Sequence, residues 1–435
     1  GNLSFQDQLI TEELEYKYHF ITFMDTENTW VYGPEGFYLP SAEALIRAYT
    51  ANALKAYSKK HYADAVIYDI QSETYVNRLN IEPPLEFINL KNGILNLDNN
   101  ELIPHDPGFF FTSNIPVKYD PLATCPAFDD FLEDIVKSDD AIVLQEFTGY
   151  LLYRTHKFQK ALLLVGEGNN AKSTFLSVQK ELLGPGNIAS ISLQNLNRRF
   201  APARLYHKFA NIYADLSSSA LKQTGIFKMT TGGDIIEAEI KYSMQPLKFV
   251  NYAKHEFSAN VIPLVEEDDS DAFFRRWIII TFPFRFEGKN CDKDILRKLT
   301  IPEELSGILN WALEGLKRLR GTKGFSYSQT TDQIREQYSR LASSVYGFLE
   351  DCTEYEPRGF LPKDTLYKAY IEYCIEKNLP RKAKKIFSEE LPKHRPAVLP
   401  KRAKVDGAGP FVRGWEGIRI LSEEELKERG QLKLV

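Results

Sequence analysis

The sequence is poor in cysteine, tryptophan and methionine, and it contains no long apolar run. Its 435 residues include four cysteines, four tryptophans and three methionines, and no two cysteines form a CxxC pair. This spacing argues against a disulfide framework and a cysteine zinc site, and it predicts a reducing, intracellular and specifically cytoplasmic setting. The longest apolar runs, residues 161–165 and 277–282 among them, fall far short of the roughly 20 residues that span a bilayer, so we expect no membrane contact.

The chain also lacks a secretory signal, an internal repeat and a low-complexity tract. It begins Gly-Asn rather than Met, from which we expect an excised fragment or a tag remnant. With 43% hydrophobic residues the chain can bury real cores, which excludes wholesale disorder. Its length predicts about three domains.

Charge is distributed unevenly along the chain. Residues 1–150 contain 9 Lys and Arg against 24 Asp and Glu, whereas residues 151–435 contain 45 against 35. The net charge of −5 is therefore an average over an acidic first third and a basic remainder. Because the basic part can contact phosphates, the weakly acidic total does not argue against nucleic acid as a partner.

Short β-rich runs separated by helix-length segments mark the central part of the chain. This alternation favours an α/β fold with three layers and a largely parallel sheet. Before it, residues 1–85 mix helical patterns with a hairpin-like stretch, and a hairpin is expected to turn at Asn92-Gly93. After residue 322 the pattern becomes helical again and ends in a basic segment and a glycine-rich hairpin.

The strongest local motif is a glycine-rich turn between a predicted strand and a predicted helix. Residues 162–174 read LLLVGEGNNAKST, close to the phosphate-binding pattern GxxxxGK[ST]. Backbone N–H groups of such a turn cradle phosphates, the lysine neutralises the β- and γ-phosphates, and the serine hydroxyl holds Mg²⁺. The predicted nucleotide-binding residues are Gly166, Gly168, Asn169, Asn170, Ala171, Lys172, Ser173 and Thr174. An ordinary turn before a core helix is the alternative for the loop alone.

One position of this loop departs from the pattern, because Ala171 stands where glycine is expected. If the backbone there needs a positive φ, the alanine Cβ costs on the order of 1 kcal/mol. The departure leaves nucleotide binding plausible.

Polar residues at the ends of three later strands strengthen the nucleotide hypothesis. Asp215 ends the run FANIYAD and suits Mg²⁺ coordination, and Asn260 follows FSA and suits orientation of a water near a γ-phosphate. Arg275 and Arg276 precede a fourth strand, where one can reach a neighbouring subunit's phosphate while the other pairs structurally. Each feature taken singly is also typical of ordinary strand ends.

The order of these motifs resembles that of the superfamily 3 helicases of phage, plasmid and large-DNA-virus primase–helicases, a branch of the AAA+ ATPases. The resemblance extends from about residue 86 onward and includes LKNGILNL at 90–97, VKYDP at 117–121 and TGGD at 231–234. It implies a pre-helicase segment over 86–150, a AAA+ motor over 151–322 and a winged-helix DNA-binding domain over 323–435. From its position alone, the mainly helical region over 1–85 is expected to be collar-like.

The resemblance also implies a ring oligomer, a hexamer, that hydrolyses ATP with Mg²⁺ and translocates 3′→5′ on single-stranded and forked DNA. In such a motor Lys172, Ser173 and Asp215 bind phosphates and metal, Asn260 senses the γ-phosphate, and Arg275 or Arg276 acts on the neighbouring subunit. A hairpin over 234–242 lines the pore and presents Lys241 and Tyr242 to DNA. A primase–polymerase domain is expected upstream in a longer chain.

Two other functions remain open at this point. Ala214 stands where relatives commonly carry a second acid beside Asp215, so hydrolysis could be slow, or another carboxylate could substitute. With Ala171, this favours as an alternative a nucleotide-gated, weakly hydrolysing origin-recognition module. A P-loop packaging motor or kinase also fits the loop but gives no reason for the basic C-terminal part.

In that C-terminal part, residues 376–404 contain ten Lys and Arg against three Asp and Glu. We expect a recognition helix over 386–391 and a wing ending near residue 420, with DNA contact or interdomain docking as the role.

Overall fold

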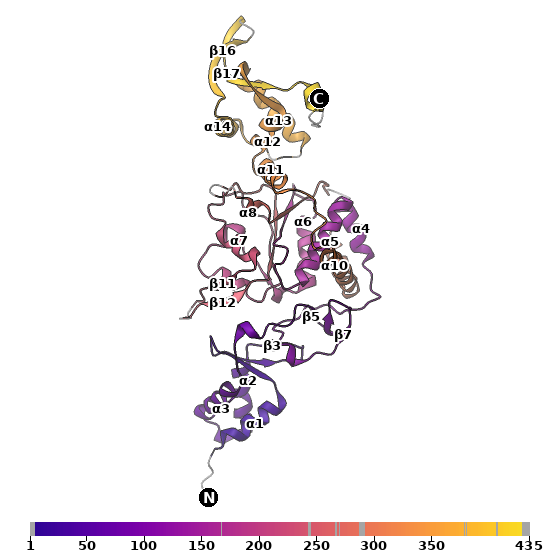
Figure 1. Cartoon of the computed structure of the whole chain (residues 1–435), viewed down its shortest axis with the longest axis vertical. Coiled ribbons are helices and arrows are strands. Elements are labelled where there is room, and N and C mark those ends of the chain that lie inside the picture. Colours follow the sequence, from indigo (N-terminus) through magenta and orange to yellow (C-terminus); the bar gives the residue numbers. More distant parts are fainter. Residues whose placement is uncertain are drawn as a thin grey trace.

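The computed structural model describes residues 5–166, 168–241, 245–265, 268, 270–286, 292–377, 379, 381–405 and 408–428. The elements follow one another along a single long axis, with the N-terminus at one end and the C-terminus at the other (Figure 1). Within these residues Cys125, Cys352 and Cys374 are buried free thiols. Every helix described is too short or too polar to cross a membrane.

The N-terminal part combines three helices with a small sheet. The helices are α1 (Asp7–Lys17), α2 (Ala42–Leu54) and α3 (Lys60–Glu73). The sheet has the order β3-β2-β1-β4, formed by β1 (Phe20–Phe23), β2 (Thr29–Tyr32), β3 (Tyr38–Leu39) and β4 (Tyr75–Val76). Buried apolar residues such as Leu14, Ile46 and Val66 join the helices. The expected helices are thus accompanied by four strands.

A second small sheet and two helices lead into the central part. The antiparallel strands are β5 (Phe87–Leu90), β6 (Gly93–Asn96) and β7 (Leu102–Ile103), and Leu90 lies opposite Gly93. The hairpin therefore turns where Asn92-Gly93 predicts it. Gly93 is required there, because a Cβ would lie 2.5 Å from the Ile103 carbonyl oxygen. Helices α4 (Pro126–Ile135) and α5 (Ser138–Leu152) follow.

The central part is built on a five-stranded parallel sheet of order β14-β8-β13-β10-β9. Its strands are β8 (Ala161–Val165), β9 (Ile188–Ala189), β10 (Ala210–Tyr213), β13 (Lys254–Ala259) and β14 (Trp277–Thr281). The chain leaves β8 for the far edge and returns to place β13 beside it. The strand order thus changes direction at β8, and ligand crevices form outside the carboxyl ends at such a point.

Alternate side chains of β8 enter two different cores, so both faces of the sheet are covered. Leu162 and Leu164 pack with α4, α5, α6 (Lys172–Leu183) and α10 (Pro302–Thr322). Leu163 and Val165 pack with α7 (Gly225–Gly232), α8 (Asp271–Phe274) and α11 (Thr331–Ala342). The predicted α/β architecture with helices on both sides of a parallel sheet is confirmed. Short helix α9 (Ile295–Leu299) lies beside α6.

An antiparallel hairpin and a separate C-terminal unit complete the chain. The hairpin consists of β11 (Ile235–Ala238) and β12 (Leu247–Val250). The C-terminal unit contains α12 (Ser344–Cys352), α13 (Lys363–Glu376) and α14 (Lys384–His394), followed after the sheet by α15 (Glu423–Glu428). Its antiparallel sheet has the order β15-β17-β16, from β15 (Thr353–Pro362), β16 (Leu399–Val405) and β17 (Ala408–Ile420). Phe348, Tyr370 and Trp415 contribute to a core of its own.

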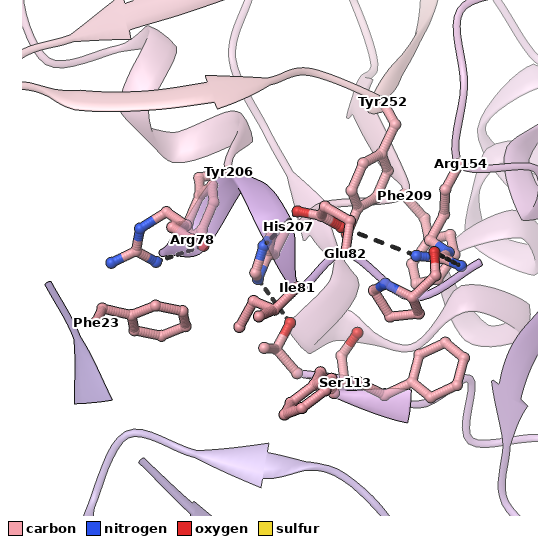
Figure 2. A pocket seen from close by; sticks show the side chains of 14 residues that line it. Phe23, Arg78, Ile81, Glu82, Ser113, Arg154, Tyr206, His207, Phe209 and Tyr252 are labelled. Atoms are coloured by element: carbon pink, nitrogen blue, oxygen red, sulfur yellow. Dashed lines mark hydrogen bonds and ion pairs between the residues drawn. The ribbon is translucent and has the colours of Figure 1, made fainter. Parts of the chain in front are cut away.

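Arg78 joins the N-terminal part to the central part (Figure 2). Its Nε and Nη2 donate to the Asp25 carboxylate at 2.9 and 3.0 Å, and its Nη1 donates to the Tyr206 hydroxyl. The guanidinium also lies 3.8 Å from the centroid of the Phe23 ring. One buried arginine thus touches both parts of the chain.

Arg154, which lies between α5 and β8, holds the linker that follows Arg78 (Figure 2). Its Nη2 donates to the carbonyl oxygens of Pro83, Pro84 and Phe87 at 3.0, 2.6 and 3.1 Å. Its Nη1 also lies 3.9 Å from the carboxylate of Glu82. A planar guanidinium is well suited to several acceptors at once.

Candidate functional site

An open cleft of about 1050 Å³ lies at the carboxyl ends of β8, β10 and β13. It is lined by the loop after β8, the start of α6, and the residues that follow β10 and β13. Among the residues predicted for nucleotide binding or catalysis, Gly168, Asn169, Asn170, Ala171, Lys172, Ser173, Thr174, Asp215 and Asn260 all face this cleft. Residues from three strand ends, far apart in the sequence, thus meet in one place.

The loop before α6 contains two residues in the left-handed conformation. Asn169 has φ 62° and Ala171 has φ 66°. Asparagine tolerates this region, but an alanine Cβ costs roughly 1–2 kcal/mol there. The positive φ that would strain Ala171 is therefore present, and the loop keeps its shape despite the missing glycine.

Gly166 at the end of β8 is fixed by close contacts. A Cβ on Gly166 would lie 2.1 Å from Asn170 Nδ2 and 2.7 Å from the Phe282 carbonyl oxygen. Asn170 Nδ2 itself donates to that carbonyl at 3.2 Å. Only glycine allows the loop to close on the neighbouring strand in this way.

Lys172, at the start of α6, points its ammonium group at the centre of this loop. Its Nζ donates to the Gly166 carbonyl at 2.6 Å, to Asn170 Oδ1 at 2.9 Å and to Asn260 Oδ1 at 3.2 Å. Burial lowers the pKa of Lys172 to about 8, with the negative charge of Asp215 opposing the shift. A cation desolvated in this way gains more from an incoming anion than a lysine in water does.

Ser173 and Asp215 supply exposed oxygen atoms to the same cleft. Asp215 has φ 60°, and its backbone N–H donates to Ser258 Oγ of β13 at 3.2 Å. Hydroxyl and carboxylate oxygens, completed by phosphate and water, are the ligands that Mg²⁺ prefers. Groups of three or more His, Cys, Asp or Glu that could hold a metal alone do not occur in the described residues.

The two adjacent arginines have different surroundings. Arg276 is 6% exposed, its Nε donates to Thr231 Oγ1 at 2.7 Å, and its Nη1 donates to the Ala272 carbonyl. Arg275 is exposed, and neither arginine lines the cleft of its own chain. Arg276 is thus engaged within the fold, whereas Arg275 points outward.

The predicted DNA-contacting hairpin is formed by β11 and β12. Lys241 is exposed in the connection between these strands. Tyr242 lies outside the described residues.

Sequence reasoning missed the acidic wall of the cleft. Asp130 and Asp134 of α4 and Asp292 face it alongside Lys293 and Lys298. Asp130 and Asp134 are one helical turn apart, which places them on the same face of α4. The sequence gives no signal for them, since α4 precedes the loop by more than thirty residues and only packing against α6 brings it near.

Three family models match separate parts of the chain. Residues 9–137 match "D5 N terminal like", residues 164–276 match a family of unknown function, DUF5906, and residues 342–412 match "Poxvirus D5 protein-like". The middle match contains most of the loop, Asp215, Asn260 and both arginines.

Solved structures of the NrS-1 C terminal region share the fold. The A form apo structure of residues 305–718 of that protein aligns with a TM-score of 0.51 at 10% identity, covering 95% of this chain and 100% of that one. Another A form apo structure of the region gives 0.48 at 12% identity with the same coverage. The first of these supports the overall mixed α/β arrangement.

The two D5-type matches lie at opposite ends of the chain and flank the cleft-bearing sheet. Together they show that both ends of the chain are similar to D5-type proteins.

Proposed function

We propose that this chain is an ATP-dependent replicative DNA helicase of superfamily 3 with a AAA+ motor. The proposal rests mainly on one observation: Lys172, Ser173, Asp215 and Asn260 meet in one large cleft at the switch point of a parallel sheet. The strand order β14-β8-β13-β10-β9 supports it, because the loop lies after β8, where that order changes direction. The D5-type matches supply the replication setting.

ATP is the proposed substrate, and Mg²⁺ is the proposed cofactor. Lys172 and the backbone N–H groups at the start of α6 would bind the phosphates, in the manner of helix N-termini that hold anions. Ser173 and Asp215 would hold Mg²⁺, which neutralises charge on the phosphates. Asn260 already contacts Lys172 and would sense the γ-phosphate. The acidic wall formed by Asp130 and Asp134 suits the sugar end of ATP better than its phosphates.

We assign the arginine finger to Arg275. The engaged guanidinium of Arg276 supports a structural role for that residue, and the exposure of Arg275 leaves it available to a neighbouring subunit. This assignment requires a ring oligomer, proposed as a hexamer, with each cleft completed by the next subunit.

The proposed DNA contacts begin with the β11–β12 hairpin, where Lys241 would hold a phosphate and Tyr242 would stack on a base. The C-terminal unit is proposed as a winged-helix domain. Helices α12, α13 and α14 and the antiparallel β16–β17 hairpin support this proposal. Translocation 3′→5′ and an upstream primase–polymerase domain follow from the family resemblance.

A subunit-mixing experiment tests the central proposal. Wild-type protein should show DNA-stimulated ATPase and unwinding, and Lys172→Ala and Arg275→Ala should each lose at least about a hundredfold in ATPase. Mixed in equal amounts, the two variants should recover up to about a quarter of wild-type ATPase, because some interfaces combine an intact Lys172 with an intact Arg275. Equal rates for wild type and Lys172→Ala would refute the site, and absence of recovery would refute the finger.

The second candidate function is a nucleotide-gated DNA-binding module with little hydrolysis. It is favoured by Ala214, which packs against the core beside α6 and offers no carboxylate next to Asp215. This candidate predicts ATP-dependent assembly on DNA with negligible phosphate release. Robust turnover that depends on Lys172 would eliminate it.

A further inference from the structure

The β16–β17 hairpin of the C-terminal unit presents two chemically different faces. Residues directly opposite each other in an antiparallel pair point to the same face. Arg402 lies opposite Arg413, and Lys404 lies opposite Phe411. These pairs are two residues apart along each strand, so all four side chains share one face.

We call this surface the basic hairpin face and define it by Lys363, Arg402, Lys404, Phe411 and Arg413. Lys363 belongs to it because its Nζ lies 4.5 Å from the ring centroid of Trp415, which is two residues from Arg413 on the same strand. Lys363, Arg402 and Arg413 also border a shallow hollow of about 180 Å³.

The cations of the basic hairpin face differ from Lys401 in their ion pairing. In the part of the chain that the structure describes, Lys363, Arg402, Lys404 and Arg413 form no ion pair with a carboxylate. On the opposite face Lys401 is paired with Glu416. Like charges directly opposite each other across two strands destabilise a hairpin, so the Arg402–Arg413 pair has a cost that an anion between them would remove.

The predicted recognition helix contrasts with this face. Lys384 at the start of α14 pairs with Asp364, Lys382 lies 4.0 Å from Glu390, and Arg395 lies 2.7 Å from Glu350. Three of the ten cations counted in residues 376–404 are therefore paired around α14.

An exposed aromatic ring accompanies the charge. Phe411 is 63% exposed, and Lys404 Nζ lies 5.7 Å from its ring centroid. A cationic groove with an accessible aromatic ring is typical of single-stranded nucleic-acid binding, because an unpaired base can stack on the ring while its phosphates meet the cations. In a duplex the bases are already stacked and paired.

We propose that the basic hairpin face binds single-stranded DNA, with a phosphate between Arg402 and Arg413 and a base on Phe411. The hairpin lies at the far end of the molecule from the N-terminal part, beyond α12 and α13 (Figure 1). It would therefore hold a strand at a site separate from the β11–β12 hairpin. The proposal deepens the proposed winged-helix role of the C-terminal unit, on which it rests, by assigning single-stranded DNA and the contacting residues.

Fluorescence anisotropy with labelled oligo(dT) and the full chain, in the absence of nucleotide, tests this proposal. Arg402→Ala/Arg413→Ala should weaken binding about tenfold and reduce the slope of log affinity against log salt by about 0.7, the value for the one phosphate contact that is lost. Phe411→Ala should weaken binding about five- to tenfold with the salt slope unchanged. Lys385→Ala/Lys393→Ala on α14 removes the same charge and should have a much smaller effect.

The outcomes separate this proposal from the helicase proposal. Thermal unfolding of each variant shows that it is folded, and removal of the like-charged pair should not lower the melting temperature. Unchanged affinity and slope for the Arg402/Arg413 double variant, or an equal loss for the α14 double variant, would overturn the proposal. Preferential competition by duplex DNA or by an acidic peptide would overturn the single-strand assignment. These binding measurements contain no ATP. They therefore remain interpretable even if the protein fails to hydrolyse ATP.

Discussion

Polar side chains in the amino half of β13 and at its carboxyl end have opposite surroundings. In its amino half Lys254, His255 and Glu256 are fully buried, whereas its carboxyl end presents Ser258 and Asn260 to the cleft. Burial lowers the pKa of Lys254 far below its usual range, lowers that of His255 to about 3 and raises that of Glu256 to about 8. His255 and Glu256 are therefore mostly neutral at pH 7, and the pKa of Lys254 is shifted in the direction that favours its neutral form. Directly after the strand, the side chain of Asn260 is exposed to solvent and to a ligand.

This contrast shows at which positions of a buried sheet a polar side chain can bind a ligand. Lys254 Nζ donates to the Tyr153 carbonyl and lies 4.7 Å from the Tyr150 ring centroid, so its role is internal. Lys172 is desolvated less strongly and keeps its charge near neutral pH. A polar residue at a strand's carboxyl end is thus available for binding, and one inside the strand stabilises or strains the fold.

The largest expected effect comes from Glu256. Both of its carboxylate oxygens lack a hydrogen-bond partner among the described residues. Desolvation raises its pKa from 4.5 to about 8, with the Lys180 charge opposing the shift. The folded state keeps the proton while the unfolded chain releases it, so the free energy of unfolding should fall as pH rises from about 4.5 to about 8. Glu256→Gln should remove this fall and stabilise the protein by on the order of 3 kcal/mol at pH 7.

Urea unfolding at pH 5 and pH 7.5 measures this effect. Wild type and Glu256→Gln should have similar free energies of unfolding at pH 5, and these should differ at pH 7.5. Glu389→Gln, at an exposed position of α14, is the matched control and should follow wild type at both values. Equal pH dependence in Glu256→Gln and wild type would show that Glu256 is not protonated in the folded state.

A smaller effect is expected at the carboxyl edge, on the pH dependence of nucleotide affinity. Burial lowers the pKa of Lys172 to about 8, so the ammonium group that would meet phosphate is lost as pH rises above that value. ATP affinity should be nearly constant from pH 6.5 to 7.5 and should fall by up to about fivefold from pH 8 to pH 9, a change of about 1 kcal/mol. Isothermal titration in two buffers of different ionisation enthalpy should detect proton uptake on binding above pH 8. A Lys172→Arg variant that binds ATP should lack this dependence, and the same fall in that variant would assign it to another group.

The smallest effect concerns Ala171. Its left-handed conformation strains the Cβ by roughly 1–2 kcal/mol, and the greater unfolded-state entropy of glycine offsets about half of this. Ala171→Gly should therefore raise the free energy of unfolding by about 0.5–1 kcal/mol. Gly168→Ala is the control. A Cβ on Gly168 would meet no atom within 4 Å, and Gly168 is not one of the glycines with a positive φ. Destabilisation by Ala171→Gly would show that the alanine methyl contributes packing that outweighs the strain.

Much of the sheet and its layers could be predicted from the sequence. The runs at 161–165 and 277–282 correspond to β8 and β14, because buried parallel strands are nearly continuous in apolar residues. The runs that precede Asp215 and Asn260 correspond to β10 and β13. Strand β9 was missed, since two residues give no periodic signal. The sheet of the N-terminal part was also only partly foreseen, because two of its strands are equally short.

The candidate site was less predictable than the strands. The motif places Lys172 and Ser173 on a helix start, but only tertiary packing brings Asp130 and Asp134 to the cleft. The sequence does not distinguish Arg275 from Arg276, because exposure depends on the contact between Arg276 and Thr231, forty-five positions away. Likewise the basic count over 376–404 does not reveal which cations are paired, since their partners Asp364 and Glu350 lie outside that segment.

The Arg154 contacts with the linker have a mechanical consequence. Arg154 lies before the strand that leads into the phosphate-binding motif, and it binds three carbonyl groups within residues 83–87 of the chain leading from the N-terminal part. Arg78 fixes the other end of the same linker to Asp25 and Tyr206. A short segment fastened at both ends acts as a strut rather than a hinge. A tilt at the amino end of β8 would therefore be passed to the N-terminal helices as a rigid displacement.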